Sequence, residues 1–475
     1  MLKYNDMRDI QNKAAEFLYE RDEGLLLGDV GSGKTVIALT AISWLLDDYP
    51  SEGFLVLAPQ KVCQLVWQQE AEKWDHLEHL SFAVLSGGSP QARRKMLCEN
   101  HHIYLANYEL IPWLCREFPN GFAQISGLWF DELDKLKDRR TARFKGQTIN
   151  DRGKRVRVKG IQQWRKNFNL IYGMTGTPNS RHYLDLWAEV FCLDGGRTLG
   201  SSFSKFRQEY FYQTDYMGYS WAPFETTKEK IFDKLAPFTF RIESYADLPA
   251  LVELPPRIVE FPKDAYKRYR EMEKHCLTRF GDGDVVKAIN SAVAYGKLRQ
   301  ATAGFMYDEE KTPKTTSLAK FQELASLLSE LQGQQAVIVY HYQEELATLY
   351  KQYNKRIAHL GGNQTKTDAM GVLTDFRKGK LELLALHPQS AGHGIDGLQD
   401  AGCRHIIMLT EPETAGLYRQ VIGRLRRTGQ KADAVFVHRI HVANTIDQYQ
   451  DARVHERVEE MQELLDEMKK RTGVE

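Results

Sequence analysis

The amino-acid sequence predicts an α/β protein that contains two parallel-sheet units with a helical insertion and connector between them. Short apolar runs alternate with segments of helical periodicity, first over residues 24–172 and again over residues 336–437. Such alternation is typical of parallel strands joined by crossover helices, which cover both faces of the sheet. A chain of 475 residues is also too long for one ordinary domain. We therefore predict three regions: residues 1–180, residues 181–312 and residues 313–475.

The composition is that of a globular protein, with 42% hydrophobic and 27% charged residues. There is no apolar run of membrane-spanning length, and the N-terminus MLKYNDMRDI lacks the apolar core of a signal peptide. We therefore expect a cytoplasmic protein without a membrane partner. The scattered cysteines form no C-x-x-C pair and no Cys/His cluster at zinc spacing, so we expect reduced packing residues. A net charge of +1 neither suggests nor excludes nucleic acid as a partner.

The elements of the first unit follow from these patterns in order. Residues 3–20 have the apolar spacing of an amphipathic helix. A short apolar strand, residues 24–27, comes next, and a helix follows it. Later apolar runs predict further strands at residues 54–58, 82–85, 103–106, 128–130 and 169–172.

From about Arg181 to Thr312 the alternation stops. This region is rich in aromatic and charged residues and is interrupted by prolines, which indicates an inserted helical region and a connector. Alternation then resumes with predicted strands at residues 336–340, 381–385, 405–409 and 434–437. Residues 445–471 are predicted to form one long, charge-rich helix.

The segment from Gly28 to Thr35 reads GDVGSGKT and matches the pattern G-x-x-x-x-G-K-[ST] in full. It lies between a predicted strand and a predicted helix, which is the context the motif requires. Backbone N–H groups of such a loop bind phosphate oxygens, Lys34 reaches the β- and γ-phosphates, and Thr35 places its hydroxyl on Mg²⁺. A chance match in a glycine-rich turn is the alternative, and the flanking elements argue against it. The predicted nucleotide-binding residues are Gly28, Asp29, Val30, Gly31, Ser32, Gly33, Lys34 and Thr35.

Asp131 and Glu132 follow the predicted strand at residues 128–130. In a phosphate-binding α/β unit a Mg²⁺-holding acid is needed at this end of the sheet. We predict Asp131 as a Mg²⁺ ligand with Thr35, and Glu132 either as the general base or as the residue that orients the attacking water. Acids in the first turn of a helix are a common alternative. The phosphate loop upstream favours the catalytic interpretation.

Two further segments suggest a phosphate-dependent mechanism. Residues 173–178, GMTGTP, follow a predicted strand and suit a sensor of the phosphate site, although a plain turn is the alternative. On a helix, Gln420, Arg424 and Arg427 share one face by their spacing. Two guanidinium groups on one face suit a triphosphate, and an arginine finger contributes about 10³–10⁵ to the rate. A solvated basic helix is the commoner fate of such a run. Because Lys34 and Arg424 fall in different units, the pattern suits a site completed by both.

The ordered motifs resemble those of superfamily two helicases, most closely the Swi/Snf-like branch with its bacterial and phage members. The matching segments are Gln11, GDVGSGKT, VLAPQ, LANYE, DELD, TGTP, SAGHGID and QVIGRLRRTGQ. The resemblance spans residues 4–450. It implies two RecA-like domains with ATP and Mg²⁺ bound between them and nucleic acid lying across both. The implied activity is ATP-driven translocation on duplex DNA. An RNA helicase with the same core and a nucleotide-switched nucleic-acid-binding scaffold remain the alternatives.

The resemblance also implies roles for individual residues. Gln11 would read the adenine, with Arg8 or Met7 nearby. The motifs that contact the nucleic-acid backbone contain Lys61, Asn107, Tyr108, Ser390 and His393. There are two departures from the pattern: Asp134 stands where many relatives carry His, and Asp396 stands where the branch usually shows Asn. A carboxylate repels phosphate, so a nucleic-acid contact at Asp396 is in doubt.

A basic stretch, residues 137–166, lies between DELD and TGTP and contains twelve lysines and arginines. A solvated loop is one interpretation of this stretch. Its density of arginine and the neighbouring Trp164 make a nucleic-acid-contacting loop the other.

Overall fold

The computed structural model divides the chain into two compact units. Unit 1 consists of Met1–Tyr245 with Arg457–Glu475, and unit 2 of Ala246–Glu456. The structure describes residues 1–29, 31–50, 52–151, 154–178, 182–215, 221–243, 248–275, 277–279, 285–287, 291–361, 364, 366–391, 397–427 and 429–472. Among these, no helix combines the length and the apolar composition that a membrane crossing requires.

Unit 1 is built on a seven-stranded parallel sheet with the strand order β11-β1-β8-β5-β2-β4-β3. Its strands are β1 (Glu23–Gly28), β2 (Gly53–Ala58), β3 (Phe82–Val84), β4 (Ile103–Asn107), β5 (Ile125–Asp131), β8 (Leu170–Thr175) and β11 (Thr239–Ile242). The first six confirm the strands predicted from apolar runs. The sequence did not predict β11, which pairs with β1 from beyond residue 180.

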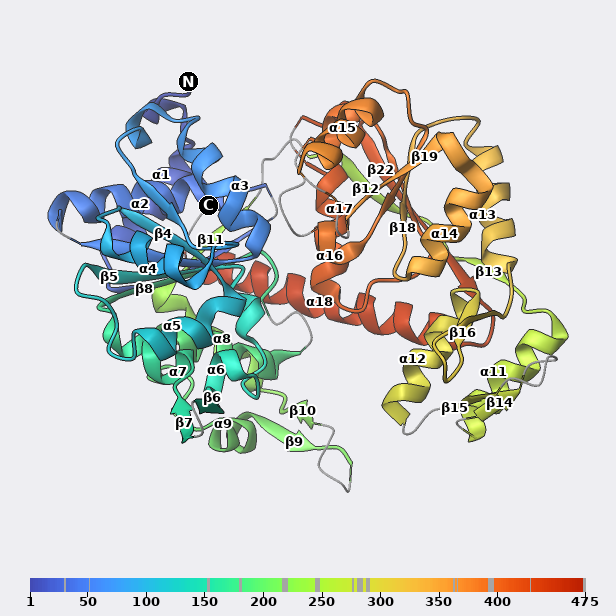
Figure 1. Cartoon of the computed structure of the whole chain (residues 1–475), viewed down its shortest axis with the longest axis horizontal. Coiled ribbons are helices and arrows are strands. Elements are labelled where there is room, and N and C mark those ends of the chain that lie inside the picture. Colours follow the sequence, from blue (N-terminus) through green and yellow to red (C-terminus); the bar gives the residue numbers. More distant parts are fainter. Residues whose placement is uncertain are drawn as a thin grey trace. The chain divides into compact units, whose positions relative to one another are not determined.

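Helices cover both faces of this sheet (Figure 1). They are α1 (Asp9–Tyr19), α2 (Lys34–Asp48), α3 (Gln60–Ala71), α4 (Pro90–Cys98), α5 (Ile111–Glu117) and α8 (Leu186–Asp194). Apolar residues of α1, α2 and α3 form one core with β1 and β2, while α8 contacts β1 and β8. The predicted helix over residues 3–20 is divided into a 3₁₀ turn, η1 (Tyr4–Asp6), and α1.

The basic stretch is folded, so its prediction as a loop was wrong for the described residues. After η4 (Leu133–Leu136) it forms α6 (Ala142–Lys145), β6 (Gln147–Asp151), β7 (Lys154–Val158) and α7 (Ile161–Trp164). Strands β6 and β7 make an antiparallel hairpin that pairs Thr148 with Arg157. Arg-Val-Arg-Val at residues 155–158 is a period-2 alternation, which is a strand signal that the density of charge concealed.

The region predicted as a helical insertion contains strands as well as helices. Unit 1 continues through α9 (Phe203–Tyr210), the hairpin of β9 (Phe211–Gln213) and β10 (Trp221–Pro223), and α10 (Thr227–Leu235) before reaching β11. In unit 2, β12 (Ala250–Glu253) and β13 (Arg257–Val259) both pair with β22 (Ala434–Val442). The compact units therefore divide at residues other than the predicted 180 and 312.

Unit 2 contains a second sheet with the order β12-β22-β21-β18-β20-β19, in which the paired strands are parallel. The remaining strands are β18 (Ala336–Val339), β19 (Ile357–Leu360), β20 (Leu383–Leu386) and β21 (His405–Met408). This confirms the four predicted strands. The sequence did not predict β19, which is short and carries a histidine, or β12 and β13, whose side chains are partly or fully exposed.

The helices of unit 2 lie around this sheet (Figure 1). They are α11 (Lys263–His275), α12 (Ser291–Thr302), α13 (Ala319–Glu330), α14 (Gln343–Tyr353), α15 (Lys366–Arg377), α16 (Pro388–Ala391) and α17 (Ala415–Leu425). Two short antiparallel ladders complete the unit: β14 (Leu277–Arg279) with β15 (Val285–Lys287), and β16 (Phe305–Tyr307) with β17 (Pro313–Thr315).

The C-terminal helix α18 (Ile446–Thr472) confirms the long helix predicted over residues 445–471. Its second half belongs to unit 1. There the Tyr183 hydroxyl donates to the Glu460 carbonyl over 3.2 Å, and Lys469 pairs with Glu243 at 3.0 Å.

Candidate active site

The phosphate loop has the backbone that its glycines permit. Strand β1 ends at Gly28, α2 begins at Lys34, and Gly31 and Gly33 adopt φ angles of 86° and 84°. These angles lie in the left-handed region, which favours glycine. A Cβ at Gly33 would lie 2.2 Å from Nε2 of Gln11, so a side chain at that position would displace the Gln11 amide. Val30 lies outside the described residues.

Lys34 lies against the loop and near the strand-end acids. Its Nζ donates to the carbonyls of Gly28 (2.8 Å) and Asp29 (3.0 Å). Burial lowers the pKa of Lys34, and the charges of Glu132 and Asp131 oppose that shift. A half-buried cation on a glycine loop, within electrostatic reach of two carboxylates, is suited to hold phosphate oxygens.

Gln11 and Arg8 both contact the phosphate loop. The Ser32 carbonyl accepts from Arg8 Nη2 over 2.8 Å and from Gln11 Nε2 over 3.2 Å. Gln11 Oε1 also accepts from the Arg8 backbone N–H over 2.9 Å. The structure thus places both residues beside the loop, while adenine recognition by Gln11 stays a prediction.

Asp131 is buried at the end of β5, where Trp67 Nε1 donates to its Oδ2 over 2.9 Å. Burial, with the neighbouring Glu132 charge, raises the pKa of Asp131 to about 7. A nearby cation would stabilise the ionised form of a carboxylate that is destabilised in this way. Thr35 lies in the first turn of α2. Hydroxyl and carboxylate oxygens are hard ligands, so Asp131 and Thr35 fit the Mg²⁺ that the sequence predicts.

Glu132 adopts a φ of 59°, which is uncommon for a residue with a side chain. Such strain persists only where the surroundings hold it, and it clusters at functional sites. Tyr108 supplies part of the support, because its hydroxyl donates to the carbonyls of Asp131 (2.8 Å) and Glu132 (3.3 Å). The side chain of Tyr108 is 1% exposed. The structure therefore gives Tyr108 a positioning contact, and its predicted contact with nucleic acid stays a prediction.

The TGTP segment lies beside the phosphate loop, as a phosphate sensor requires. Thr175 pairs with Leu27 across β8 and β1. A Cβ at Gly176 would lie 2.9 Å from the Gly28 carbonyl oxygen and 3.4 Å from Lys34 Nζ, so only glycine allows this approach. Thr175 Oγ1 accepts from the Thr177 backbone N–H over 3.0 Å. The sensing role itself stays a prediction.

Sequence reasoning missed Arg241, a buried arginine on β11 that reaches the phosphate loop. Its side chain is 1% exposed, and Nη2 lies 2.9 Å from Asp29 Oδ1. Nη1 donates to the carbonyls of Leu27 and Ile242. The two partners Arg241 and Asp29 are 212 residues apart, so no local pattern could have joined them.

The Arg241–Asp29 pair yields a stability prediction. Arg241→Ala is expected to lower the free energy of unfolding by about 3 kcal/mol, because Asp29 loses the guanidinium that compensates its largely buried charge. Urea unfolding measures this loss. The matched control is the double variant Arg241→Met with Asp29→Asn, which removes both charges and is expected to recover most of the stability. A single variant as stable as the wild type would contradict the prediction.

In unit 2, Gln420 and Arg424 lie on α17, as predicted, but Arg427 does not. The helix ends at Leu425, with Arg426 as its C-cap and Gly429 at a φ of 91°. The prediction of one helical face is therefore wrong for Arg427, because α17 ends at Leu425, before Arg427 is reached. Gln430 also holds this end, since its Nε2 donates to the Leu425 carbonyl over 3.1 Å.

The predicted nucleic-acid contacts fall at different depths. Lys61 is half-buried in the first turn of α3. Asn107, only 8% exposed, accepts from Ser86 Oγ at 3.0 Å and donates to Glu109 at 2.8 Å. Ser390 falls in α16, and nothing is described of its side chain. His393 and Asp396 lie outside the described residues, and Asp134 is buried beside Lys137 at 3.6 Å.

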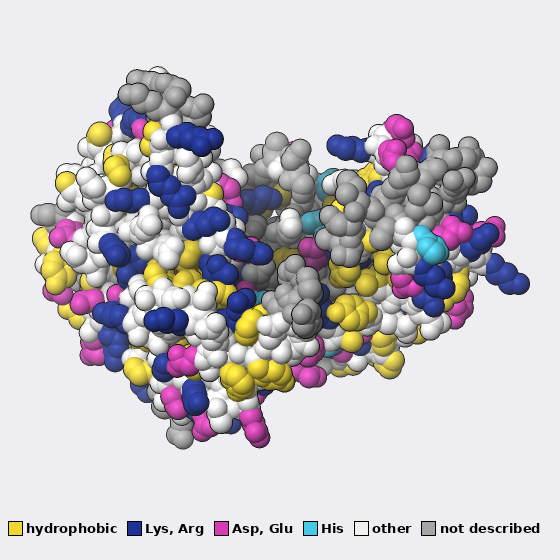
Figure 2. All heavy atoms as spheres, turned by 90° about the horizontal axis from the view of Figure 1, so that it is seen from below, with side chains coloured by type: hydrophobic (Ala, Val, Ile, Leu, Met, Phe, Trp, Pro, Cys, Tyr) yellow, Lys and Arg dark blue, Asp and Glu magenta, His cyan; other side chains and the backbone are white. Residues whose placement is uncertain are grey.

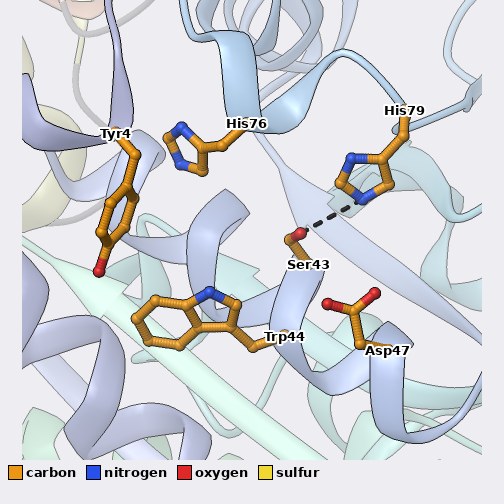
Figure 3. Close-up of a pocket in the computed structure, with 6 residues that line it drawn as sticks. All are labelled: Tyr4, Ser43, Trp44, Asp47, His76 and His79. Atoms are coloured by element: carbon orange, nitrogen blue, oxygen red, sulfur yellow. Dashed lines mark hydrogen bonds between the residues drawn. The ribbon is translucent and has the colours of Figure 1, made fainter.

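A separate cavity of about 570 Å³ lies along α2, beyond the phosphate loop. Figure 3 shows the aromatic rings of Tyr4, Trp44 and His76 on one side and the Ser43 hydroxyl bonded to His79 on the other. The Ser43–His79 bond measures 3.2 Å, and the Tyr4 and His76 rings meet edge to face with their centres 5.2 Å apart. The lining contains none of the residues predicted to bind nucleotide.

Comparison with protein families identifies both units. The model of the SNF2-related domain matches residues 10–236, and the model of the helicase conserved C-terminal domain matches residues 319–429. The chain belongs to the Swi/Snf-like branch of superfamily two. In this Swi/Snf-like chain the two parallel-sheet units are the RecA-like lobes, and the use of ATP by the family agrees with the geometry around Lys34.

Individual relatives of the Swi/Snf-like chain differ in how much of their length is matched. Putative protein p41 of Acyrthosiphon pisum secondary endosymbiont phage 1 is 29% identical over 454 residues, which cover 93% of this chain and 94% of p41. The SWI/SNF chromatin-remodeling complex subunit snf22 of Schizosaccharomyces pombe is 22% identical over 430 residues, covering 82% of this chain and 24% of snf22. The SWI2/SNF2 ATPase core of Sulfolobus solfataricus, solved with double-stranded DNA, is 20% identical with a TM-score of 0.42, covering 94% of this chain and 90% of that chain.

Proposed function

We propose that this Swi/Snf-like chain is a DNA-dependent ATPase that translocates on duplex DNA. The observation that carries the proposal is the cluster in unit 1, where Lys34 lies against the phosphate loop within electrostatic reach of Asp131 and Glu132. Membership of the Swi/Snf-like branch supports duplex DNA as the partner.

In the proposed reaction, the phosphate loop and Lys34 bind the triphosphate, and Gln11 with Arg8 holds the loop from the side of α1. Glu132 accepts the proton of the attacking water, and its left-handed backbone sets the direction in which its side chain leaves the turn. Thr35 and Asp131 would hold Mg²⁺, which when bound supplies positive charge to the triphosphate.

Arg424 and Arg427, assisted by Gln420, are proposed to stabilise the negative charge that develops on the transferred phosphate. They belong to unit 2, whereas Lys34 belongs to unit 1. Hydrolysis would therefore require both units, and alternation between nucleotide states would alternate their grips on the DNA backbone.

Steady-state ATP hydrolysis tests this function. Turnover is expected to be highest with duplex DNA, compared with no nucleic acid, single-stranded DNA or RNA of equal length. Displacement of a third strand from a triplex, dependent on ATP, is expected to accompany it. Stimulation by RNA alone would instead favour the RNA helicase. The absence of turnover with every nucleic acid would favour the nucleotide-switched scaffold.

A further inference from the structure

The β6–β7 hairpin presents a cationic face to solvent. Side chains alternate along a strand, so Arg155 and Arg157 share one face and Val156 and Val158 the other. Val158 is buried, whereas both arginines are exposed. Apolar contact therefore fixes the base of β7 and leaves its arginines on the surface.

The structure separates the cations of the basic stretch into two groups. The first group is engaged by protein partners: Lys137 by Asp134, Arg139 by the Phe203 ring, Arg140 by Asp138, Arg143 by Glu109 and Arg165 by the Cys192 carbonyl. These cations serve the fold.

The second group consists of the exposed cations on or beside the hairpin, Lys145, Arg155, Arg157 and Lys159, while Lys166 is exposed after α7. Arg157 donates to the Lys145 carbonyl over 2.9 Å, and Lys159 donates to the Pro119 carbonyl over 3.2 Å. Carbonyl contacts orient these side chains without neutralising them. Within the described ranges, no carboxylate forms an ion pair with any of the four. Their positive charge is thus available to an anionic partner.

The base of the hairpin is connected to a motif predicted to contact nucleic acid. One carboxylate oxygen of Glu109 accepts from Asn107 Nδ2 over 2.8 Å, and the other lies 3.3 Å from Arg143 Nη1. Asn107 ends β4 in the LANYE motif, and Arg143 lies on α6 immediately before the hairpin. Figure 2 views the molecule from the side on which β6, β7 and α9 lie in Figure 1, and dark-blue Lys and Arg side chains are spread widely over unit 1 there.

We propose that this hairpin is an additional phosphate-contacting surface for duplex DNA, extending the edge of unit 1 that carries Asn107. The proposal rests on the DNA-motor function proposed above. A two-stranded ribbon matches the major groove of B-DNA, which is about 12 Å wide, and exposed arginines contact the flanking phosphates. The major groove of A-form RNA is too deep and narrow for side chains to read, so duplex DNA is the expected partner.

The test is the salt dependence of DNA binding by the full chain carrying Arg155→Gln with Arg157→Gln. The logarithm of affinity falls with the logarithm of salt by about 0.9 for each phosphate contact, so losing two contacts is expected to reduce the slope by about 1.8. Anisotropy of a labelled duplex between about 50 and 200 mM salt measures the slope. The matched control, Lys13→Gln with Lys95→Gln, removes two exposed charges elsewhere in unit 1 and is expected to keep the wild-type slope.

Two further measurements separate the possible failures. Arg155→Lys with Arg157→Lys keeps both charges, so it is expected to retain the wild-type salt dependence of DNA binding. A reduced salt dependence in this variant would overturn the proposal, because the effect of the glutamine variant would then come from a folding defect and not from lost charge. A wild-type protein that binds no DNA would contradict the DNA-motor function instead. If the wild-type protein binds duplex DNA and the glutamine variant shows the same salt dependence, only the hairpin surface is overturned. A slope that changes on single-stranded DNA or RNA but not on duplex would overturn the assignment to duplex DNA.

Discussion

Lys34→Ala is expected to lower ATP turnover at least about 10²-fold, the effect of removing one preorganised donor from a developing negative charge. The physical reason lies in the position of Lys34, whose ammonium is held by two carbonyls of the phosphate loop within electrostatic reach of Asp131 and Glu132. Steady-state hydrolysis with saturating duplex DNA measures the change.

Because Lys34 also donates to two loop carbonyls, its removal affects the loop as well as the triphosphate. Thermal unfolding of the variant distinguishes a collapsed protein from an inactive one. Lys13→Ala, an exposed lysine on α1 in the same unit, is the matched control and is expected to keep wild-type turnover. A fully active Lys34→Ala protein would contradict the assignment of GDVGSGKT as the catalytic phosphate loop.

Arg424→Ala and Arg427→Ala, made separately, are each expected to preserve ATP binding and to slow hydrolysis. The loss of an arginine finger corresponds to about 10³–10⁵ in rate. Arg424 lies within α17 and Arg427 beyond its end, so the two need not contribute equally. Single-turnover hydrolysis, with nucleotide binding measured in parallel, identifies which of them is the finger.

The same segment provides an internal control at Arg426. Its Nε donates to the Pro249 carbonyl over 3.0 Å within unit 2. Arg426→Ala is therefore expected to cost about 1 kcal/mol of stability, the net worth of one hydrogen bond, while hydrolysis proceeds. Wild-type hydrolysis by both finger variants would exclude these arginines from the mechanism.

The parts of the site that the sequence predicted are those carried by contiguous residues. GDVGSGKT needs only its own glycines and flanking elements, and Asp131 needs only the apolar strand before it. Buried parallel strands were found because they read as unbroken apolar runs. Edge strands such as β12, which has only four residues and none of them buried, lack that signal.

The parts that escaped prediction depend on contacts between distant segments. Arg241 lies on a strand that the sequence did not predict, and its role becomes visible only through its ion pair with Asp29. Trp67 and Tyr108 lie on separate elements, and both donate hydrogen bonds to Asp131. From the sequence alone, Trp67 would be assigned to a core and Tyr108 to a nucleic-acid contact. For Arg427, helical spacing was extended past Leu425, where the helix ends.

The position of β11 has a consequence for the order in which the chain can fold during synthesis. A nascent or truncated protein ending at residue 180 leaves β1 as the unprotected margin of its sheet, with Leu25, Leu26 and Leu27 open to pairing with another chain. Strand β11 closes that margin, and the second half of α18, from Arg457 onward, also belongs to unit 1. Unit 1, which contains α1, is therefore completed only after unit 2 and the second half of α18 have been synthesised.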